Sequence, residues 1–134
     1  MKIEDNLDKL IKALRSGEYI QGIKKLRRGV GGNVEYCPLG VGCELFRQNY
    51  HGTYHYEWKV LPKVLTTENI YFFCVVERGT NRVLQDDPNF MFEVVRNYYG
   101  FSMNDMHKIA NMNDDDEYTF DQIADYIEQM EILV

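Results

Sequence analysis

Four side chains in the first half of the chain carry donor atoms suited to a metal: Cys37, Cys43, His51 and His55. Thiolate sulfur and imidazole nitrogen are the ligands that zinc prefers, but a zinc knuckle places its two cysteines about two to four residues apart in a tight turn. Cys37 and Cys43 would lie at opposite ends of about 1.5 helical turns. We therefore expect no metal and no other cofactor, with Cys43 a small buried residue and the two histidines on a surface loop.

Cys37 also precedes Pro38, and a thiol at the start of a helix can become a nucleophile because the helix dipole lowers its pKa. One of the three histidines would then serve as its base. No cysteine-hydrolase signature surrounds Cys37, and three cysteines at sparse spacing fit reduced thiols. The sequence favours a buried structural cysteine, so an enzyme is the less favoured class of protein.

A basic and glycine-rich segment follows the first helical stretch. Its candidate ligand-binding residues are Lys24, Lys25, Arg27, Arg28, Gly31 and Gly32. Such a loop can present backbone N–H groups and cations to a phosphate. The order of a P-loop is absent, and no dinucleotide fingerprint precedes a helix. The segment therefore predicts either a solvated charged surface or contact with a nucleotide or nucleic acid.

Acidic side chains gather towards the other end of the chain. The candidate partner-binding residues are Asp114, Asp115, Asp116, Glu117, Asp121, Asp125 and Glu128. Up to Lys63 the chain has 11 Lys and Arg against 7 Asp and Glu, and after it 4 against 14, which gives +4 and −10. Two interpretations remain open: a solvated acidic helix, or an acidic surface that docks on a basic protein groove.

Oxygen-bearing side chains alternate in the same region, as they do in a calcium loop. They are Asn111, Asn113, Asp115, Glu117, Thr119 and Asp121. The glycine that such a loop needs at its sixth position is Asp116, and the glutamate that it needs at its twelfth is Gln122. Because the sharp turn and the strongest ligand are both missing, we interpret the acids as helix-start residues.

The elements that must position these residues follow from the apolar pattern. Periodicity of about 3.6 residues predicts helices over 3–16, from Pro38 onward and over 87–100. Capping boxes at Ser102 and Thr119 predict two more.

Strands are predicted where the periodicity changes. Aromatic side chains alternate with polar ones over 51–60, and 70–76 is a continuous β-branched and aromatic run. The glycines over 29–32 predict an irregular hairpin or a mobile loop. The predicted fold class is α+β, a single compact domain over residues 1–134 with helix in the majority and a small antiparallel sheet.

Composition limits the class of protein further. The chain has 134 residues, of which 45% are hydrophobic and 27% charged, so one ordinary folded core is expected. No run approaches the roughly 20 apolar residues of a membrane span. The first residues are acidic where a secretory signal would be basic and then apolar. We expect a cytoplasmic protein that does not contact a membrane.

Several segments together resemble a family of small, uncharacterised proteins found in bacteriophage and prophage-bearing bacterial genomes. The segments are Ala13–Tyr19, Gln21-Gly22, Leu26-Arg27, Tyr36–Leu45, Met112–Asp114 and Thr119–Glu128. The resemblance implies a phage-type accessory protein in an infected or lysogenic cytoplasm. The motif residues predict a core between the first, second and last helices, formed by Leu14, Leu39, Val41, Leu45, Phe120, Ile123 and Ile127. The Asn113-Asp114 pair would turn the chain.

Two functions follow from these features. The first is a non-enzymatic protein that binds and modulates a host or defence protein through the acidic C-terminal surface. The alternative is a nucleotide or nucleic-acid binding module that uses segment 24–32.

Overall fold

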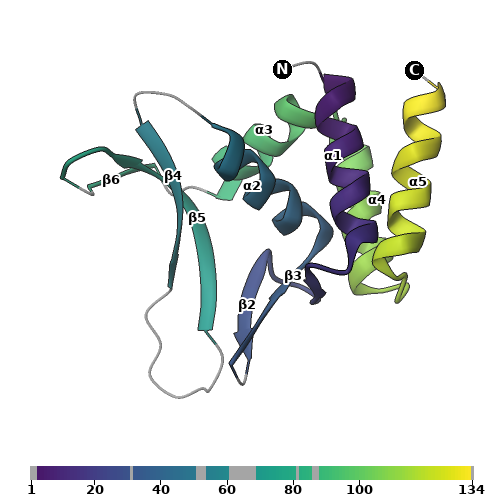
Figure 1. Cartoon of the computed structure of the whole chain (residues 1–134), viewed down its shortest axis with the longest axis horizontal. Coiled ribbons are helices and arrows are strands. Elements are labelled where there is room, and N and C mark those ends of the chain that lie inside the picture. Colours follow the sequence, from purple (N-terminus) through teal and green to yellow (C-terminus); the bar gives the residue numbers. More distant parts are fainter. Residues whose placement is uncertain are drawn as a thin grey trace.

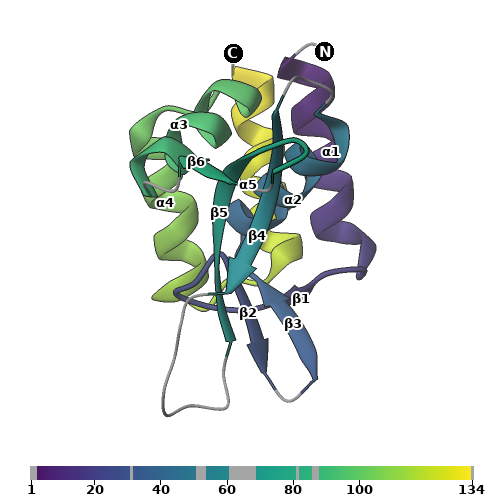
Figure 2. The same cartoon turned by 90° about the vertical axis from the view of Figure 1, so that its left-hand side faces the viewer.

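The computed structural model describes residues 3–30, 32–50, 54–60, 69–80, 82–85 and 88–133. Within these residues, five helices and six strands form one compact α+β domain, which confirms the predicted fold class. The strands form a layer on one side and the helices pack beside one another on the other side (Figure 1). Both ends of the chain lie at the same end of the molecule, at the tops of the first and last helices (Figures 1 and 2).

The first and last helices run side by side in opposite directions (Figure 1). Helix α1, Ile3–Ser16, has the predicted bounds and ends at Gly17, whose φ of 79° suits glycine. Helix α5, Phe120–Leu133, begins after Thr119, whose hydroxyl accepts a hydrogen bond from the backbone N–H of Gln122. The Gln122 side chain accepts from the backbone N–H of Thr119 in return, which confirms the predicted capping box.

Helix α2, Pro38–Asn49, lies between this helix pair and the sheet (Figure 1). Pro38 occupies its first turn as predicted, and the Cys37 side chain accepts a hydrogen bond from the backbone N–H of Gly40 at 3.3 Å. A Cβ on Gly40 would lie only 1.8 Å from the carbonyl oxygen of Leu26. Glycine at this position therefore lets the helix touch the backbone of the strand segment that carries the basic residues.

Two further helices complete the layer. Helix α3, Pro88–Tyr99, ends at Gly100, and helix α4, Met103–Asp114, begins with the predicted capping box of Ser102 and Asp105. The buried Tyr99 hydroxyl donates a hydrogen bond to the carbonyl oxygen of Gly42 at 2.7 Å, which ties α3 to α2.

The sheet has the strand order β1-β3-β2-β5-β4, and β6 also pairs with β5. The strands are β1 (Ile20–Gln21), β2 (Arg27–Val30), β3 (Asn33–Tyr36), β4 (Tyr54–Val60), β5 (Asn69–Glu77) and β6 (Val83–Gln85). The antiparallel pair β2 and β3 confirms the predicted hairpin, while β1 and β6 were not predicted. The β1–β3 pairing is parallel, so the sheet is mixed rather than wholly antiparallel.

The core lies among α1, α2, α3, α4 and α5, and Phe73 of β5 reaches it from the sheet. Six of the seven predicted core residues are buried: Leu14, Leu39, Val41, Phe120, Ile123 and Ile127. Leu45 is only half-buried and packs at the edge of this core. The predicted packing of the first, second and last helices is therefore confirmed.

Candidate functional site

The predicted basic segment does not form one continuous surface. Arg27 and Arg28 are neighbours on β2, so their side chains leave opposite faces of the strand. Arg28 forms an ion pair with Glu35 of β3 at 2.7 Å. Lys24 and Lys25 lie in the exposed turn before β2, and Gly32 lies in the hairpin turn with a φ of 87°. Gly31 falls outside the described residues.

Arg27 is held by aromatic rings instead of by a carboxylate. Its guanidinium carbon lies 4.1 Å from the ring centre of Tyr71 and 5.7 Å from those of Tyr36 and Trp58. A guanidinium in such a position gains a cation–π interaction with each ring. No carboxylate of the described residues lies within ion-pair distance of Arg27, and its buried Nε has no hydrogen-bond partner there. A half-buried cation therefore keeps a buried donor unused among the described residues.

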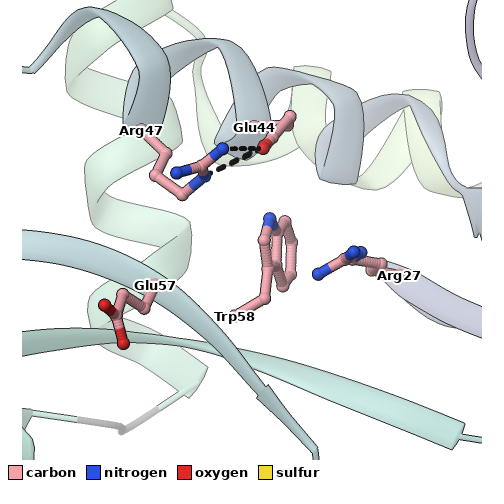
Figure 3. Close-up of a pocket in the computed structure, with 5 residues that line it drawn as sticks. All are labelled: Arg27, Glu44, Arg47, Glu57 and Trp58. Carbon is pink, nitrogen blue, oxygen red and sulfur yellow. Dashed lines mark hydrogen bonds and ion pairs between the residues drawn. The ribbon is translucent and has the colours of Figure 1, made fainter.

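A cavity of about 230 Å³ lies beside this guanidinium. We call it the arginine–aromatic pocket, and its lining residues are Arg27, Glu44, Arg47, Glu57 and Trp58. The residues come from β2, α2 and β4, which meet where the helix crosses the sheet (Figure 3). Figure 3 shows the Arg27 guanidinium facing the Trp58 ring, with the indole nitrogen turned toward the Glu44–Arg47 pair.

Both carboxylates of the arginine–aromatic pocket are already paired. Glu44 is only 5% exposed and accepts hydrogen bonds from Nε of Arg47 at 2.8 and 3.0 Å. This contact raises the pKa of Arg47. Oε1 of Glu57 lies 3.0 Å from Nε2 of His55, and its Oε2 lies 3.7 Å from Nζ of Lys59. The Glu57 carboxylate is turned away from the Trp58 ring (Figure 3). Among the described residues, the pocket is therefore left with one cation that no carboxylate balances.

Trp58 adds a second donor that the described fold does not use. Its Nε1 is buried and has no hydrogen-bond partner among the described residues. The ring packs on Phe73, with 4.9 Å between the ring centres, and meets Tyr36 edge-on at 6.2 Å. A buried indole N–H normally has an acceptor, since leaving it unpaired costs free energy.

The predicted acidic surface divides into two parts. Asp125 and Glu128, on the exposed face of α5, both accept hydrogen bonds from Arg15 of α1, at 2.6 and 2.8 Å. These contacts raise the pKa of Arg15. The cation that balances them was not among the predicted site residues.

The other part is the turn between α4 and α5. We call it the acidic corner, and its exposed carboxylates are Asp115, Asp116, Glu117 and Asp121. Within the part of the chain that the structure describes, none of them has an ion-pair partner within 4.0 Å. Asp115 is the C-cap of α4, and Glu117 has a φ of 58°, which is uncommon for a residue other than glycine. The acidic corner is a fixed turn that presents uncompensated negative charge.

A buried amide network fixes the acidic corner to the segment before β2. Asn113 is 1% exposed, and its Nδ2 donates to the carbonyl oxygen of Gly22 at 2.8 Å. Gln21 donates from Nε2 to Oδ1 of Asn113 and to the carbonyl oxygen of Tyr118, both at 2.7 Å. Asp114 accepts from the backbone N–H of Lys24 at 2.7 Å. Asn113 and Asp114 thus join two distant segments, beyond their predicted role of turning the chain.

The cysteines lie in surroundings that oppose thiolate chemistry. Burial raises the pKa of the Cys37 thiol to about 12 and also raises that of Cys43. His51 falls outside the described residues. Over the described ranges, no group of three or more His, Cys, Asp and Glu side chains is placed to hold a metal. The described helices also include none long and apolar enough to cross a membrane.

Sequence reasoning found Arg27 but missed the four residues that share its pocket: Glu44, Arg47, Glu57 and Trp58. The signal that was present is the alternation over 51–60, which places Trp58 on the aromatic face of a strand. The pairing of Trp58 with Phe73 across β4 and β5 places that face under α2.

The fold and the two surfaces define a small α+β domain with an acidic corner and a separate arginine–aromatic pocket. The chain belongs to the family described as domain of unknown function DUF8296, whose model matches residues 2–131. No match was found among curated proteins or among solved structures.

Proposed function

We propose that this protein is a phage-type accessory protein that binds a basic surface of a host or defence protein and modulates it without catalysing a reaction. The contact surface would be the acidic corner, and the place of action the cytoplasm of the host cell. One observation carries the proposal: the acidic corner exposes four carboxylates that pair with no cation of the described residues.

These carboxylates do not all lie where they would stabilise the fold, so we infer that they have a role beyond folding. Asp115 caps the C-terminal end of α4, where the helix dipole is negative and favours a cation. Asp121 lies in the first turn of α5, where an acid is favourable, but it adds to the same local negative charge. A basic partner would relieve the repulsion among these carboxylates and raise the rate of encounter by electrostatic attraction.

Tyr118 gives the acidic corner an aromatic contact point. Its side chain is 42% exposed, although its backbone N–H donates to Met112 and its carbonyl accepts from Gln21. Tyrosine is enriched at protein interfaces because it supplies a large, rigid contact area with little loss of conformational entropy. A fixed backbone with an exposed ring suits a binding surface.

The alternative, binding of a nucleotide or nucleic acid by segment 24–32, has less support. Arg28 is paired with Glu35, and Arg27 faces aromatic rings on the opposite side of the strand. Four cations on one surface would favour a phosphate backbone, whereas these residues are spread over several surroundings.

The test compares capture of proteins from an infected or lysogenic host by three immobilised forms. They are the unmodified chain, a corner-reversed variant (Asp115→Lys, Asp116→Lys, Glu117→Lys) and a control-reversed variant (Asp8→Lys, Glu18→Lys, Glu93→Lys). Both variants change the net charge equally, and all six positions are exposed. We expect a basic protein to be captured by the unmodified and control-reversed chains but not by the corner-reversed chain. Equal capture of that protein by all three forms would refute the proposal.

A further inference from the structure

We propose that the arginine–aromatic pocket binds a small planar carboxylate, with the carboxylate accepting hydrogen bonds from Arg27 and Trp58. This inference does not depend on the acidic corner, which lies at the α4–α5 turn and shares no residue with the pocket.

The unused hydrogen-bonding groups define the polarity of the ligand. Nε of Arg27 and Nε1 of Trp58 are both buried and both lack a partner among the described residues. Both are donors only, so the missing group must supply acceptors. The two carboxylates of the pocket already have cationic or imidazole neighbours: Glu44 is hydrogen-bonded to Arg47, and Glu57 lies within 4.0 Å of His55 and Lys59.

The balance of charge limits the ligand to a single negative charge. Of the pocket's two arginines, Arg47 is neutralised by Glu44, whereas Arg27 has no carboxylate partner in the part of the chain that the structure describes. A dianion such as a phosphate would bring its second charge close to Glu44, where like charges repel. A carboxylate matches the planar guanidinium and carries one charge.

The size and lining of the pocket indicate the size and shape of the part of the ligand that carries the carboxylate. A volume of about 230 Å³ lies below the range of roughly 300 Å³ upward that drug-sized ligands occupy. The Trp58 ring forms one wall, with the Arg27 guanidinium beside it (Figure 3). A single flat ring can pack against the indole, whereas a whole nucleotide would extend out of the pocket into solvent.

Trp58 is the only tryptophan of the chain, so its fluorescence reports on this pocket alone. We would titrate the full chain with benzoate as the probe, and with cyclohexanecarboxylate, inorganic phosphate and adenosine monophosphate for comparison. We expect a saturable change with benzoate, with a dissociation constant of roughly 1 mM for a ligand of this size. Cyclohexanecarboxylate should bind several-fold more weakly because its ring is not flat, and phosphate should cause no saturable change.

The neighbouring arginine provides a matched control. Arg27→Gln should weaken benzoate binding by at least about tenfold, which is the loss expected from one charged hydrogen bond. Arg28→Gln removes the same charge from the opposite face of β2 and should leave the dissociation constant within about twofold. If Arg27→Gln does not fold, Trp58→Phe provides a second test. This variant lacks the indole donor but keeps an aromatic ring, and calorimetry should show that it binds benzoate more weakly.

Three results would overturn the inference. The first is the absence of any saturable response of the unmodified chain to benzoate. The second is equal weakening by Arg27→Gln and Arg28→Gln, which would indicate a general effect of charge. The third is tighter binding of phosphate or adenosine monophosphate than of benzoate, which would assign the pocket to a phosphate ligand.

Discussion

The acidic corner and the arginine–aromatic pocket both hold polar groups without a partner among the described residues, yet one set lies in water and the other is buried. Exposed carboxylates remain hydrated, so leaving them unpaired costs folding little. A buried N–H without an acceptor loses its hydration and gains nothing in return. The comparison teaches that the acidic corner can change without harm to the fold, whereas changes at the residues around the pocket should lower stability.

The largest expected effect concerns the reactivity of Cys37, a half-buried residue whose thiol has a raised pKa. Because burial raises the pKa of its thiol from 9.0 to about 12, its thiolate fraction at pH 8 falls about a thousandfold. We expect the folded chain to react with a thiol reagent at least about a hundredfold more slowly than the unfolded chain, in which three thiols react. A fast-reacting Cys37 thiol in the folded chain at pH 8 would contradict the raised pKa.

The raised pKa of Cys37 also makes the stability of the protein depend on pH. Since the folded-state pKa of Cys37 lies above the unfolded value, its contribution to stability is complete below pH 9 and is lost as the pH rises toward 12.

The next largest effect should come from the contact between α2 and the strand that carries Arg27. Gly40→Ala places a Cβ against the backbone of Leu26, which cannot move without shifting β2. We expect a loss of about 3 kcal/mol in the free energy of unfolding, measured with urea, together with a red shift of the Trp58 fluorescence. A loss below about 1 kcal/mol would show that the pocket walls adapt, and that the pocket tolerates change as well as the acidic corner does.

A somewhat smaller effect should come from the network that fixes the acidic corner. Asn113→Ala leaves the carbonyl of Gly22 and the amide of Gln21 without their partner, so we expect a loss of about 2 kcal/mol. Asn111→Ala, on the exposed side of the same helix, is the matched control and should change stability by less than about 0.5 kcal/mol. Similar losses for the two variants would mean that the network does not stabilise the turn.

The smallest effect should come from the exposed ion pairs of α1 and α5. Arg15→Gln releases Asp125 and Glu128, but both pairs are open to solvent and screened by salt. We expect a slight fall in the melting temperature at low salt and none at 1 M salt. A fall that persists at high salt would show that Arg15 contributes through packing rather than through charge.

The sequence predicted what depends on local pattern. Helix α1 and the capping boxes at Ser102 and Thr119 follow from neighbouring residues, and the structure confirms them. The arginine–aromatic pocket could not be predicted, because Arg27, Glu44 and Trp58 lie on three elements whose register depends on the whole fold. The burial of Asn113 was missed for the same reason, since its partners lie about ninety residues away in the sequence.

The most direct test of the central claim is the amount of a basic partner that the corner-reversed and control-reversed chains capture from the host. If the acidic corner is the binding surface, the corner-reversed chain captures far less than the control-reversed chain, and capture by the unmodified chain falls steeply as salt is added. Equal capture by the two variants would contradict the account and place any binding surface elsewhere on the domain.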